Sequence, residues 1–446
     1  MERRNFLKNS AIVGAGLLAS TSVFANGLGF NNSSNDSLKI ALIGCGGRGS
    51  GAVLAALKNK NVPCELVAMV DLFKHKIDEK HVAILDAVGV NKSKVKVTEE
   101  TKFTGFQGYK DAIALCDIVF IGTPAAYKPV IFAEAIRQDK HVFMEKPVCI
   151  DSLGFQSILA TAALATQKKI FVATGLQRRY SEGYKQMVNE IQDGAIGDVH
   201  TAECYWMGGP IGQLGRPRQE EWTEMEYQNR HWRSFSWVSG GNIEEFHVHN
   251  LDIINWVLGE LNPQSVIALG GKIHDREFSS AVGGFDYITS NFKYKNDVSV
   301  HSYSRNVRNC KNKTGEYFYG TKGKAIMTED GVIYNHKGKV IFTADHKKLG
   351  KMHGVHDRVQ DKLVDSIYNG KEYYNEAVYA AHSTMTGTLG RMSAWSGKEM
   401  EWDTAVQSKI QLFDYSEQTN FNSIPPILPN ANGEYPVPIP GKTIVF

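Results

Sequence analysis

The stretch Leu38–Gly49, LKIALIGCGGRG, decides the fold of this chain. Its first six residues are apolar apart from one lysine and predict a buried strand. The strand runs straight into the pattern GxGxxG, and a helical stretch from Ala52 to Leu57 follows. In this context the first glycine permits a tight turn, the second lets a phosphate group approach the backbone, and the third lets the helix pack on the strand. The stretch therefore predicts a phosphate-binding turn at a helix N-terminus.

The next predicted strand supplies an acid where such a turn requires one. Glu65–Val70 (ELVAMV) predicts a second buried strand, and Asp71 follows it, about twenty residues after the last glycine. An acid here takes the hydroxyls of a ribose and repels a 2′-phosphate, which favours NAD over NADP. The alternative is a turn that binds nothing, followed by a solvated aspartate. We expect NAD, with NADP less favoured, at Gly44, Cys45, Gly46, Gly47, Arg48 and Asp71.

Strands and helices keep alternating as far as residue 174, which predicts a parallel, doubly wound sheet. The further elements that we expect in this region lie at 117–121, 130–137, 140–144, 153–166 and 170–173. Such sheets bind ligands at the carboxyl ends of their strands. Two of these strand ends carry further candidates for the cofactor site, namely Thr123 and Pro124 after one strand and Glu145 and Lys146 after the next.

After Gly175 the pattern changes to that of a mostly antiparallel sheet. Helices are expected at 182–193, 357–368 and 378–392, and strands at 199–206, 265–270, 286–294, 297–304, 316–320 and 325–329. The predicted fold class is therefore α/β. It combines an N-terminal Rossmann domain with a doubly wound parallel sheet (38–174) and a C-terminal α/β domain with a mostly antiparallel open sheet (175–415). Residues 416–446 are rich in proline and predict an extended, wrapping arm.

The first 25 residues predict a twin-arginine signal peptide rather than a folded element. Arg3 and Arg4 begin the signature RRNFLK, an apolar run occupies 11–18, and Val-Phe-Ala at 23–25 suits a signal peptidase. The apolar run is too short to span a membrane, and residues 26–37 form a polar linker. We expect a periplasmic protein that is exported folded, which favours a cofactor loaded before export. The alternative is an ordinary basic N-terminus.

Charge and cysteine content narrow the range of partners. The formal net charge is +3 over 446 residues, which argues against nucleic acid or an anionic membrane as the main partner. The six cysteines are scattered without a CxxC pair, so we expect mostly buried thiols. A bridge between two of them stays open in an oxidising compartment.

The segment Gly240–Trp256, GGNIEEFHVHNLDIINW, carries the densest set of reactive side chains. Glu245 and His249 are four residues apart and share one face of a helix, and apolar neighbours give that helix a side to bury. An acid and an imidazole one turn apart are typical of a general acid–base pair. The alternative is a core helix with inert histidines. Glu245, His247 and His249 also offer metal ligands, but no fourth ligand is evident and we predict no metal site.

The loop before this segment, Gly208 to Trp237, is rich in arginine and tryptophan. Aromatic faces beside arginine suit a carbohydrate cleft, because the rings stack on C–H faces while polar groups meet hydroxyls. A subunit contact has a similar composition, and the sequence leaves both open. We expect substrate contacts from Arg178, Tyr180, Trp232 and His247.

The chain resembles the Gfo/Idh/MocA oxidoreductases, the glucose–fructose oxidoreductase and inositol dehydrogenase group, over roughly residues 38–400. The resemblance rests on GCGGRG, Asp71, Gly122-Thr123-Pro124, Glu145-Lys146-Pro147 and a late helix with an acid four residues before a histidine. It implies NAD(P) above a substrate cleft, hydride transfer at a sugar or cyclitol carbon, and a homo-oligomer, dimer or tetramer, formed through the open sheet.

The resemblance also implies that Lys146, Glu245 and His249 surround the reacting carbinol. In these roles His249 takes the hydroxyl proton, Lys146 polarises the oxygen and Glu245 orients the imidazole. The chain departs from the family pattern at three positions. Glu245 replaces an aspartate, His247 replaces a common glycine, and Lys128 stands where the TP loop often has a histidine.

The twin-arginine leader and the phrase HVHNLDIINW resemble the exported branch of the family. The leading expectation is an oxidoreductase for a sugar, glycoside or cyclitol, with a tightly bound cofactor. One alternative is an NAD-dependent glycosidase that acts through a transient keto-sugar and elimination, although Lys146 argues against it. The other is a nucleotide-binding scaffold or sugar sensor.

Overall fold

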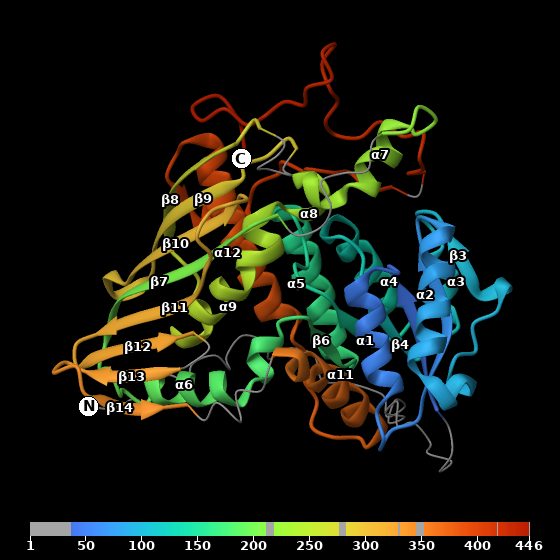
Figure 1. Cartoon of the computed structure of the whole chain (residues 1–446), viewed down its shortest axis with the longest axis horizontal. Helices are drawn as coiled ribbons and strands as arrows, with labels where there is room; N and C mark the ends of the chain where they lie inside the picture. The colour runs from blue at the N-terminus through green and yellow to red at the C-terminus, as the bar shows by residue number, and fades with distance from the viewer. Residues whose placement is uncertain are drawn as a thin grey trace, which may run out of the picture. The chain divides into compact units, whose positions relative to one another are not determined.

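Two β-sheets and the helices around them make up the computed structural model of the chain (Figure 1). The structure describes residues 37–210, 218–275, 282–328, 331–344, 352–416 and 418–445. The predicted signal peptide, residues 1–25, and the linker as far as residue 36 lie outside the described residues. Residues from Ser37 onward form one compact unit.

The first sheet is parallel throughout and has the strand order β3-β2-β1-β4-β5-β6. Its strands are β1 (Leu38–Ile43), β2 (Cys64–Asp71), β3 (Lys102–Thr104), β4 (Ile118–Ile121), β5 (His141–Met144) and β6 (Val172–Thr174). This order confirms the predicted doubly wound sheet. The connections reverse direction between β1 and β4, so the crevice that binds ligands in such sheets lies at the carboxyl ends of these two strands.

The helices that connect these strands are α1 (Gly47–Leu57), α2 (Lys74–Ala87), α3 (Tyr109–Ala114), α4 (Lys128–Arg137) and α5 (Ser152–Gln167). α1 begins inside the glycine pattern, five residues before the predicted start. The sequence did not predict α2, α3 and β3. α2 buries just Ile77 and Ile84, so its apolar periodicity is weak, and the other two elements are short.

The second sheet has the order β14-β13-β12-β11-β7-β10-β9-β8-β15. Its strands are β7 (Val199–Gly208), β8 (Ser265–Gly271), β9 (Tyr287–Lys293), β10 (Ser299–Asn306), β11 (Lys313–Gly320), β12 (Gly323–Met327), β13 (Val332–Asn335), β14 (Val340–Thr343) and β15 (Met400–Glu401). β7 and β10 run parallel, whereas the other neighbouring pairs are antiparallel. The prediction of a mostly antiparallel sheet is confirmed, although it missed the short strands β13, β14 and β15.

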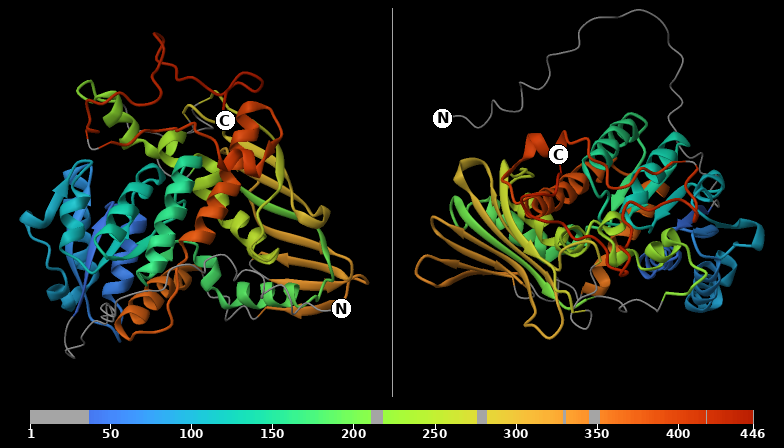
Figure 2. Two further views of the ribbon diagram at one scale, coloured as in Figure 1. Left: turned by 180° about the vertical axis from the view of Figure 1, so that it is seen from behind. Right: turned by 90° about the horizontal axis from the view of Figure 1, so that it is seen from above.

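Helices pack on one face of the second sheet (Figure 2). They are α6 (Glu182–Gln192), α9 (Val248–Val257) and α12 (Ala377–Ser396). The opposite face of the strands is turned away from these helices in both views of Figure 2. The further α-helices are α7 (Glu224–Arg230), α8 (Ser236–Ser239), α11 (Met352–Tyr368) and α13 (Trp402–Val406).

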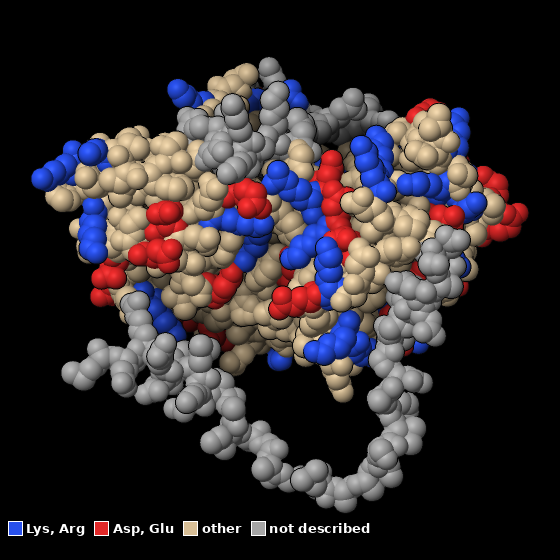
Figure 3. Space-filling view, turned by 90° about the horizontal axis from the view of Figure 1, so that it is seen from below, with Lys and Arg blue, Asp and Glu red and all other residues tan. Residues whose placement is uncertain are grey.

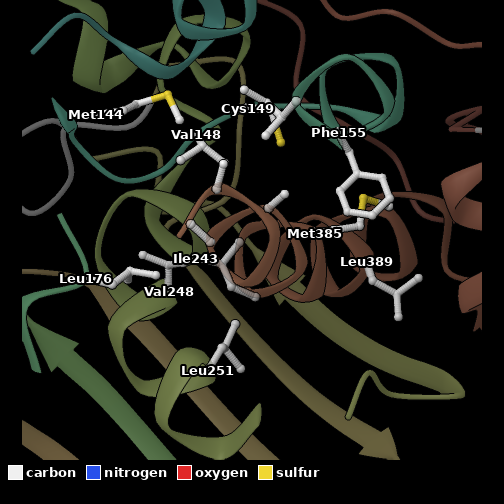
Figure 4. Close-up of a cluster of buried hydrophobic side chains, with 14 of the residues drawn as sticks. Met144, Val148, Cys149, Phe155, Leu176, Ile243, Val248, Leu251, Met385 and Leu389 are labelled. Carbon is white, nitrogen blue, oxygen red and sulfur yellow. The ribbon is translucent and has the colours of Figure 1, made fainter. Parts of the chain in front are cut away.

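Helix α12 joins the cores of the two sheets. It is buried along nearly its whole length and contacts α5 on one side and α9 and β8 on the other. Figure 4 shows Met385 and Leu389 of α12 between two groups of apolar side chains. The group from the end of β5 is Met144, Val148 and Cys149, and the group from the segment that carries Glu245 is Ile243, Val248 and Leu251. One core therefore fixes both segments of the candidate site.

The surface and the thiols agree with an ordinary globular protein. Five of the six cysteines are buried thiols, Cys310 is exposed and none is paired, which confirms the predicted thiols. Lys and Arg side chains alternate with Asp and Glu on the face drawn in Figure 3. The described ranges contain no helix that is both long and apolar enough to cross a membrane.

The described residues beyond 416 contain no helix or strand and lie along α7 and α12 (Figure 1, red). The Gln228 side chain donates to the Ile427 carbonyl over 2.7 Å. The Gly441 amide donates to the Ser396 carbonyl, also over 2.7 Å. These contacts tie the C-terminal arm to both helices.

Candidate active site

The glycine turn has the geometry that a bound phosphate requires. Gly44 has a φ of +95°, and a Cβ there would come within 2.6 Å of the Gly122 backbone. A Cβ on Gly49 would come within 2.6 Å of the Gly44 carbonyl oxygen. Nothing lies within 4 Å of where a Cβ of Gly46 or Gly47 would stand. The turn is therefore closed toward the sheet and open where a pyrophosphate would approach.

Asp71 ends β2 directly beside this turn. Its Oδ2 accepts the Cys45 amide over 2.9 Å, and its Oδ1 accepts the Phe73 amide over 3.1 Å. Cys45 contributes its backbone alone, because its thiol is buried against the Val70 carbonyl and burial raises its pKa well above the ordinary value. The carboxylate is thus fixed at the strand end where a ribose hydroxyl would bind.

A cavity adjoins the turn and is lined by several of the predicted cofactor residues. Its walls include Gly44, Gly46, Asp71, Thr123 and Pro124 from the parallel sheet, and Trp232 and Tyr415 from later segments. The buried Thr123 Oγ1 has no hydrogen-bond partner among the described residues. An open glycine turn, an acid for a ribose and an unpartnered buried hydroxyl fit an NAD molecule.

The turn after β5 brings Glu145 and Lys146 to the edge of the parallel sheet where the glycine turn also lies. Glu145 is buried, and its Oε1 lies 3.3 Å from Nη2 of Arg48 in the glycine pattern. Arg48 Nη2 also lies 2.7 Å from His356 Nδ1 of α11. The Lys146–Pro147 peptide is cis. These contacts tie the turn that carries Lys146 to the glycine turn.

Lys146 and Glu245 are brought together from positions about a hundred residues apart. The Lys146 ammonium donates to the Glu245 backbone carbonyl, and its Nζ lies 3.8 Å from Glu245 Oε1. Arg233 Nε lies 3.9 Å from the same oxygen. Lys146 also lies 5.7 Å from the centre of the Phe246 ring. A cation is therefore held against the segment that carries the predicted acid.

His249 is buried beside these charges, with its ring 6.0 Å from that of Trp206. Burial, helped by the charges of Lys146 and Arg178, lowers the pKa of His249 well below its ordinary value of 6.5. The imidazole is neutral at physiological pH and makes no hydrogen bond to another described residue. It is therefore available to accept a proton from a bound ligand.

The predicted contact between Glu245 and His249 is not made within the described part of the chain. Residues Ile243–His247 form a π turn, and α9 begins after it at Val248. The spacing expected of one regular α-helix therefore does not apply to the two residues. The Glu245 carboxylate faces Lys146 and Arg233 instead, so it holds the lysine rather than orienting the imidazole.

His247 faces the second sheet rather than the site, which corrects its assignment to the substrate. Its Nε2 lies 2.7 Å from Ser302 Oγ and 3.5 Å from Cys204 Sγ, and burial lowers its pKa to about 3. His247 and His249 thus point to different surroundings. The described residues contain no group of three or more His, Cys, Asp or Glu side chains that could hold a metal ion.

Two other residues predicted to bind the substrate, Arg178 and Tyr180, make their contacts within the core. Arg178 is buried, forms an ion pair of 2.5 Å with Glu316 and lies 5.9 Å from the Trp206 ring. It affects the site through its charge, which helps to lower the pKa of His249. Tyr180 donates to Glu376 over 2.6 Å and packs in the cluster with α11. These contacts correct the assignment of Tyr180 to the substrate. Trp232 lies at the cofactor cavity.

Sequence inspection missed a polar pocket next to Glu245 and Phe246. Its other walls include Arg233, Asn242, Asp286 and Asn306. Asn242 donates to Ser304 over 2.6 Å, while its buried Oδ1 has no partner among the described residues. No local pattern marks these residues, because they come from three segments that meet only in the fold.

Lys128 is a second missed residue, although its departure from the family pattern was a signal. It stands at the start of α4, is 2% exposed, and makes no hydrogen bond or ion pair with another described residue. Burial lowers its pKa from 10.5 to about 8, despite the nearby carboxylates of Glu245 and Glu145. A second cation is therefore buried beside Lys146 and Glu245.

The fold and the site together define an NAD-binding protein of the Rossmann type. The chain belongs to the Gfo/Idh/MocA family. Residues 38–174 match the part of the family described as "Oxidoreductase family, NAD-binding Rossmann fold", and residues 184–326 match the "GFO/IDH/MocA C-terminal domain".

Several known proteins are similar to this chain. Inositol 2-dehydrogenase of Rhizobium meliloti is 24% identical over 252 residues, which are 56% of this chain. A glycosyl hydrolase family 109 protein of a Shewanella species is 24% identical over 322 residues, or 66% of this chain. The chain spans 64% of the length of each of these two relatives.

Among solved structures, scyllo-inositol dehydrogenase of Lactobacillus casei with bound NAD(H) and scyllo-inositol has the same fold. The TM-score is 0.60 at 18% sequence identity, covering 82% of this chain and 100% of the other.

Proposed function

We propose that this protein transfers a hydride between NAD and a carbinol carbon of a sugar, glycoside or cyclitol, and that it holds its cofactor tightly. The observation that carries the proposal is the meeting of Lys146, which follows the end of β5, with Glu245, which lines the polar pocket. The similarity to inositol 2-dehydrogenase supports a polyhydroxylated substrate.

The bound nicotinamide would supply the hydride acceptor or donor. Gly44, Gly46, Asp71 and Thr123 would hold the dinucleotide. The Lys146 ammonium would donate to the substrate oxygen and stabilise the negative charge that develops there as the proton leaves. Glu245 would hold Lys146 in place. The neutral His249 would accept the hydroxyl proton during oxidation and return it during reduction.

The experiment that tests this proposal compares Lys146→Ala with the native protein. Without the ammonium the developing alkoxide loses its stabilising charge, so we expect turnover to fall by about a hundredfold to a thousandfold while NAD stays bound. Turnover is followed by nicotinamide absorbance with a panel of sugars, glycosides and cyclitols, and bound NAD is identified after denaturation. Lys185→Ala, which removes a surface lysine paired with Glu182, is the control. Native turnover in Lys146→Ala would remove this residue from the mechanism.

A second candidate function is NAD-dependent glycoside cleavage, which the similarity to glycosyl hydrolase family 109 proteins favours. Transient oxidation of a ring carbon acidifies the neighbouring C–H, elimination then releases the aglycone, and the hydride returns. Chromogenic glycosides separate the two functions. Release of aglycone without net reduction of NAD supports cleavage, whereas formation of a keto-sugar with reduction of the bound NAD supports the oxidoreductase.

We further propose that the protein is exported by the twin-arginine route to the periplasm. The signature at Arg3 and Arg4 supports this location. Free nicotinamide is scarce there, so a closed cycle in which one substrate is reduced as another is oxidised suits the tightly held cofactor. Replacement of both arginines by lysine should leave the protein in the cytoplasm, as fractionation would measure. We also propose a homo-oligomer through the free face of the second sheet.

A further inference from the structure

The segment that leads into the C-terminal arm lines the cofactor cavity together with Asp71. Tyr415 lines this cavity, and its hydroxyl donates to the Phe106 carbonyl. The Gln107 side chain donates to Tyr415 Oη over 3.1 Å and to the Ser416 carbonyl over 3.2 Å. Phe106 and Gln107 belong to the loop between β3 and α3. Tyr415 and Ser416 are therefore joined to a loop of the parallel-sheet half, at a residue 308 and 309 positions earlier in the sequence.

A second contact lies a few residues further along the arm. Phe421 stacks on Phe73 with ring centres 5.5 Å apart and planes inclined by 21°, and it meets Phe106 edge-on at 5.3 Å. Phe73 is two residues after Asp71 and lines the same cavity. Arg230 of α7 lies 4.2 Å from the centre of the Phe73 ring. An aromatic ring and a guanidinium group thus pack on Phe73, close in sequence to the acid predicted to bind the ribose.

Helix α7 holds the arm in this position from the other side. Thr223 Oγ1 donates to the Phe421 carbonyl over 2.5 Å. Further along, Tyr435 donates to Glu224 and packs edge-on against Phe235 at 5.2 Å. Asn229 of α7 lines the cavity and accepts a hydrogen bond of 2.6 Å from Tyr127, which lines it too. Asn229 of α7 and Tyr415 before the arm therefore line the same cavity as the glycine turn.

We propose that residues 413–416 and 418–421, which we call the strap, retain the adenosine half of the bound dinucleotide. The inference rests on the proposed NAD site and makes NAD a slowly exchanging part of the protein. The strap lies beyond the matched family regions, which end at residue 326. Release of the dinucleotide requires the Tyr415 hydrogen bonds and the Phe421 ring contacts to break first.

The test measures exchange of bound NAD for labelled NAD in the full-length holoprotein. Tyr415→Ala and Phe421→Ala remove strap contacts, and each ring pair of this kind accounts for about a tenfold change in a rate or equilibrium. We expect at least about tenfold faster exchange in each variant. Phe421→Tyr keeps the ring and should restore slow exchange. Ile424→Ala is the matched control, since this arm residue is 79% exposed.

The outcomes separate the strap from the proposed function. Native exchange rates in Tyr415→Ala and Phe421→Ala, with NAD still bound, would overturn the strap and leave the oxidoreductase intact. A native protein that binds no NAD would overturn both. A third outcome is a variant that exchanges NAD faster and also unfolds at a lower temperature, with neither change reversed in Phe421→Tyr. It would show that the arm only supports the fold, and it would overturn the strap as a retention device.

Discussion

Two lysines act on one carboxylate at this site, and they do so in different ways. Lys146 donates to the backbone of Glu245 and lies 3.8 Å from its carboxylate. Lys128 reaches the same group through its charge alone and makes no ion pair or hydrogen bond with another described residue. Burying an unpartnered cation destabilises the folded state. Such a residue beside a reaction site is placed for a ligand rather than for stability.

We expect Lys128→Met to stabilise the cofactor-free protein near pH 7 and to slow turnover. Methionine has a similar length and no charge, so the cost of burying the ammonium disappears, about 3 kcal/mol for a pKa shift of this size. The folded pKa of about 8 lies below the ordinary value of 10.5. The native protein therefore carries the full cost below pH 8 and loses it as pH rises to 10.5, so the gain should shrink over that window. Urea unfolding at several pH values measures it.

Lys102→Met is the matched control for this change. Lys102 forms ion pairs of 2.5 Å with Glu99 and 3.0 Å with Asp78, and the hydrogen bond to Glu99 is the main cause of its raised pKa. Its removal should lower stability slightly near pH 7, the opposite sign to Lys128→Met. A Lys128→Met protein that is less stable than the native one would contradict the burial cost. Unchanged turnover would exclude Lys128 from the reaction.

The sequence could not predict which surroundings the side chains of His247 and His249 face. Lys146 and Asp71 were predictable because they end strands that are locally apolar. His247 was not, because its partners Cys204 and Ser302 lie 43 and 55 residues away and meet it only across the sheet. They belong to one cross-strand row of β10, β7 and β11, Ser302, Cys204 and Glu316, which faces α9. Arg178 is joined to the same row by its ion pair with Glu316.

At the scale of elements, the π turn Ile243–His247 sets the position of Glu245. Its anchor is Glu244, which is fully buried and accepts hydrogen bonds from Arg391 over 2.7 Å and from Thr388 over 3.2 Å. Arg391 also donates to the Ile150 carbonyl. Helix α12 thereby holds the π turn in place through Arg391 and Thr388. Apolar spacing predicted the helix but not its π start, because the anchor lies 147 residues away.

We expect Arg391→Met to destabilise the protein and to slow turnover. It leaves the Glu244 carboxylate buried without its partner, which costs about 3–5 kcal/mol. The double variant Glu244→Gln/Arg391→Met buries no charge and should recover part of this loss. Urea unfolding gives the free energies, and turnover is measured on the same preparations. A single variant no less stable than the double variant would contradict the role of the pair.

At the scale of the whole molecule, the free face of the second sheet carries an aromatic and apolar row. Leu269, Thr289, Tyr303 and Tyr205 lie opposite one another across β8, β9, β10 and β7, so their side chains share one face. The rings of Tyr205 and Tyr303 stack 4.8 Å apart, and Leu269 is 75% exposed. The strands predicted from the sequence gave this alternation, whereas the strand order that assembles the row depends on contacts between distant segments.

The proposed homo-oligomer predicts that charges placed on this row separate the subunits. Leu269→Lys with Tyr303→Lys puts two like charges near the centre of the face, where a subunit interface is apolar and depleted of charge. We expect the native protein to elute as a dimer or tetramer and the double variant as a monomer, with mass measured by light scattering. Val90→Lys is the control, because Val90 is fully exposed on the parallel-sheet half. A native monomer, or a double variant with native mass, would place any subunit contact elsewhere. Since both substituted side chains point away from α9 and α12, the monomer should keep its bound NAD.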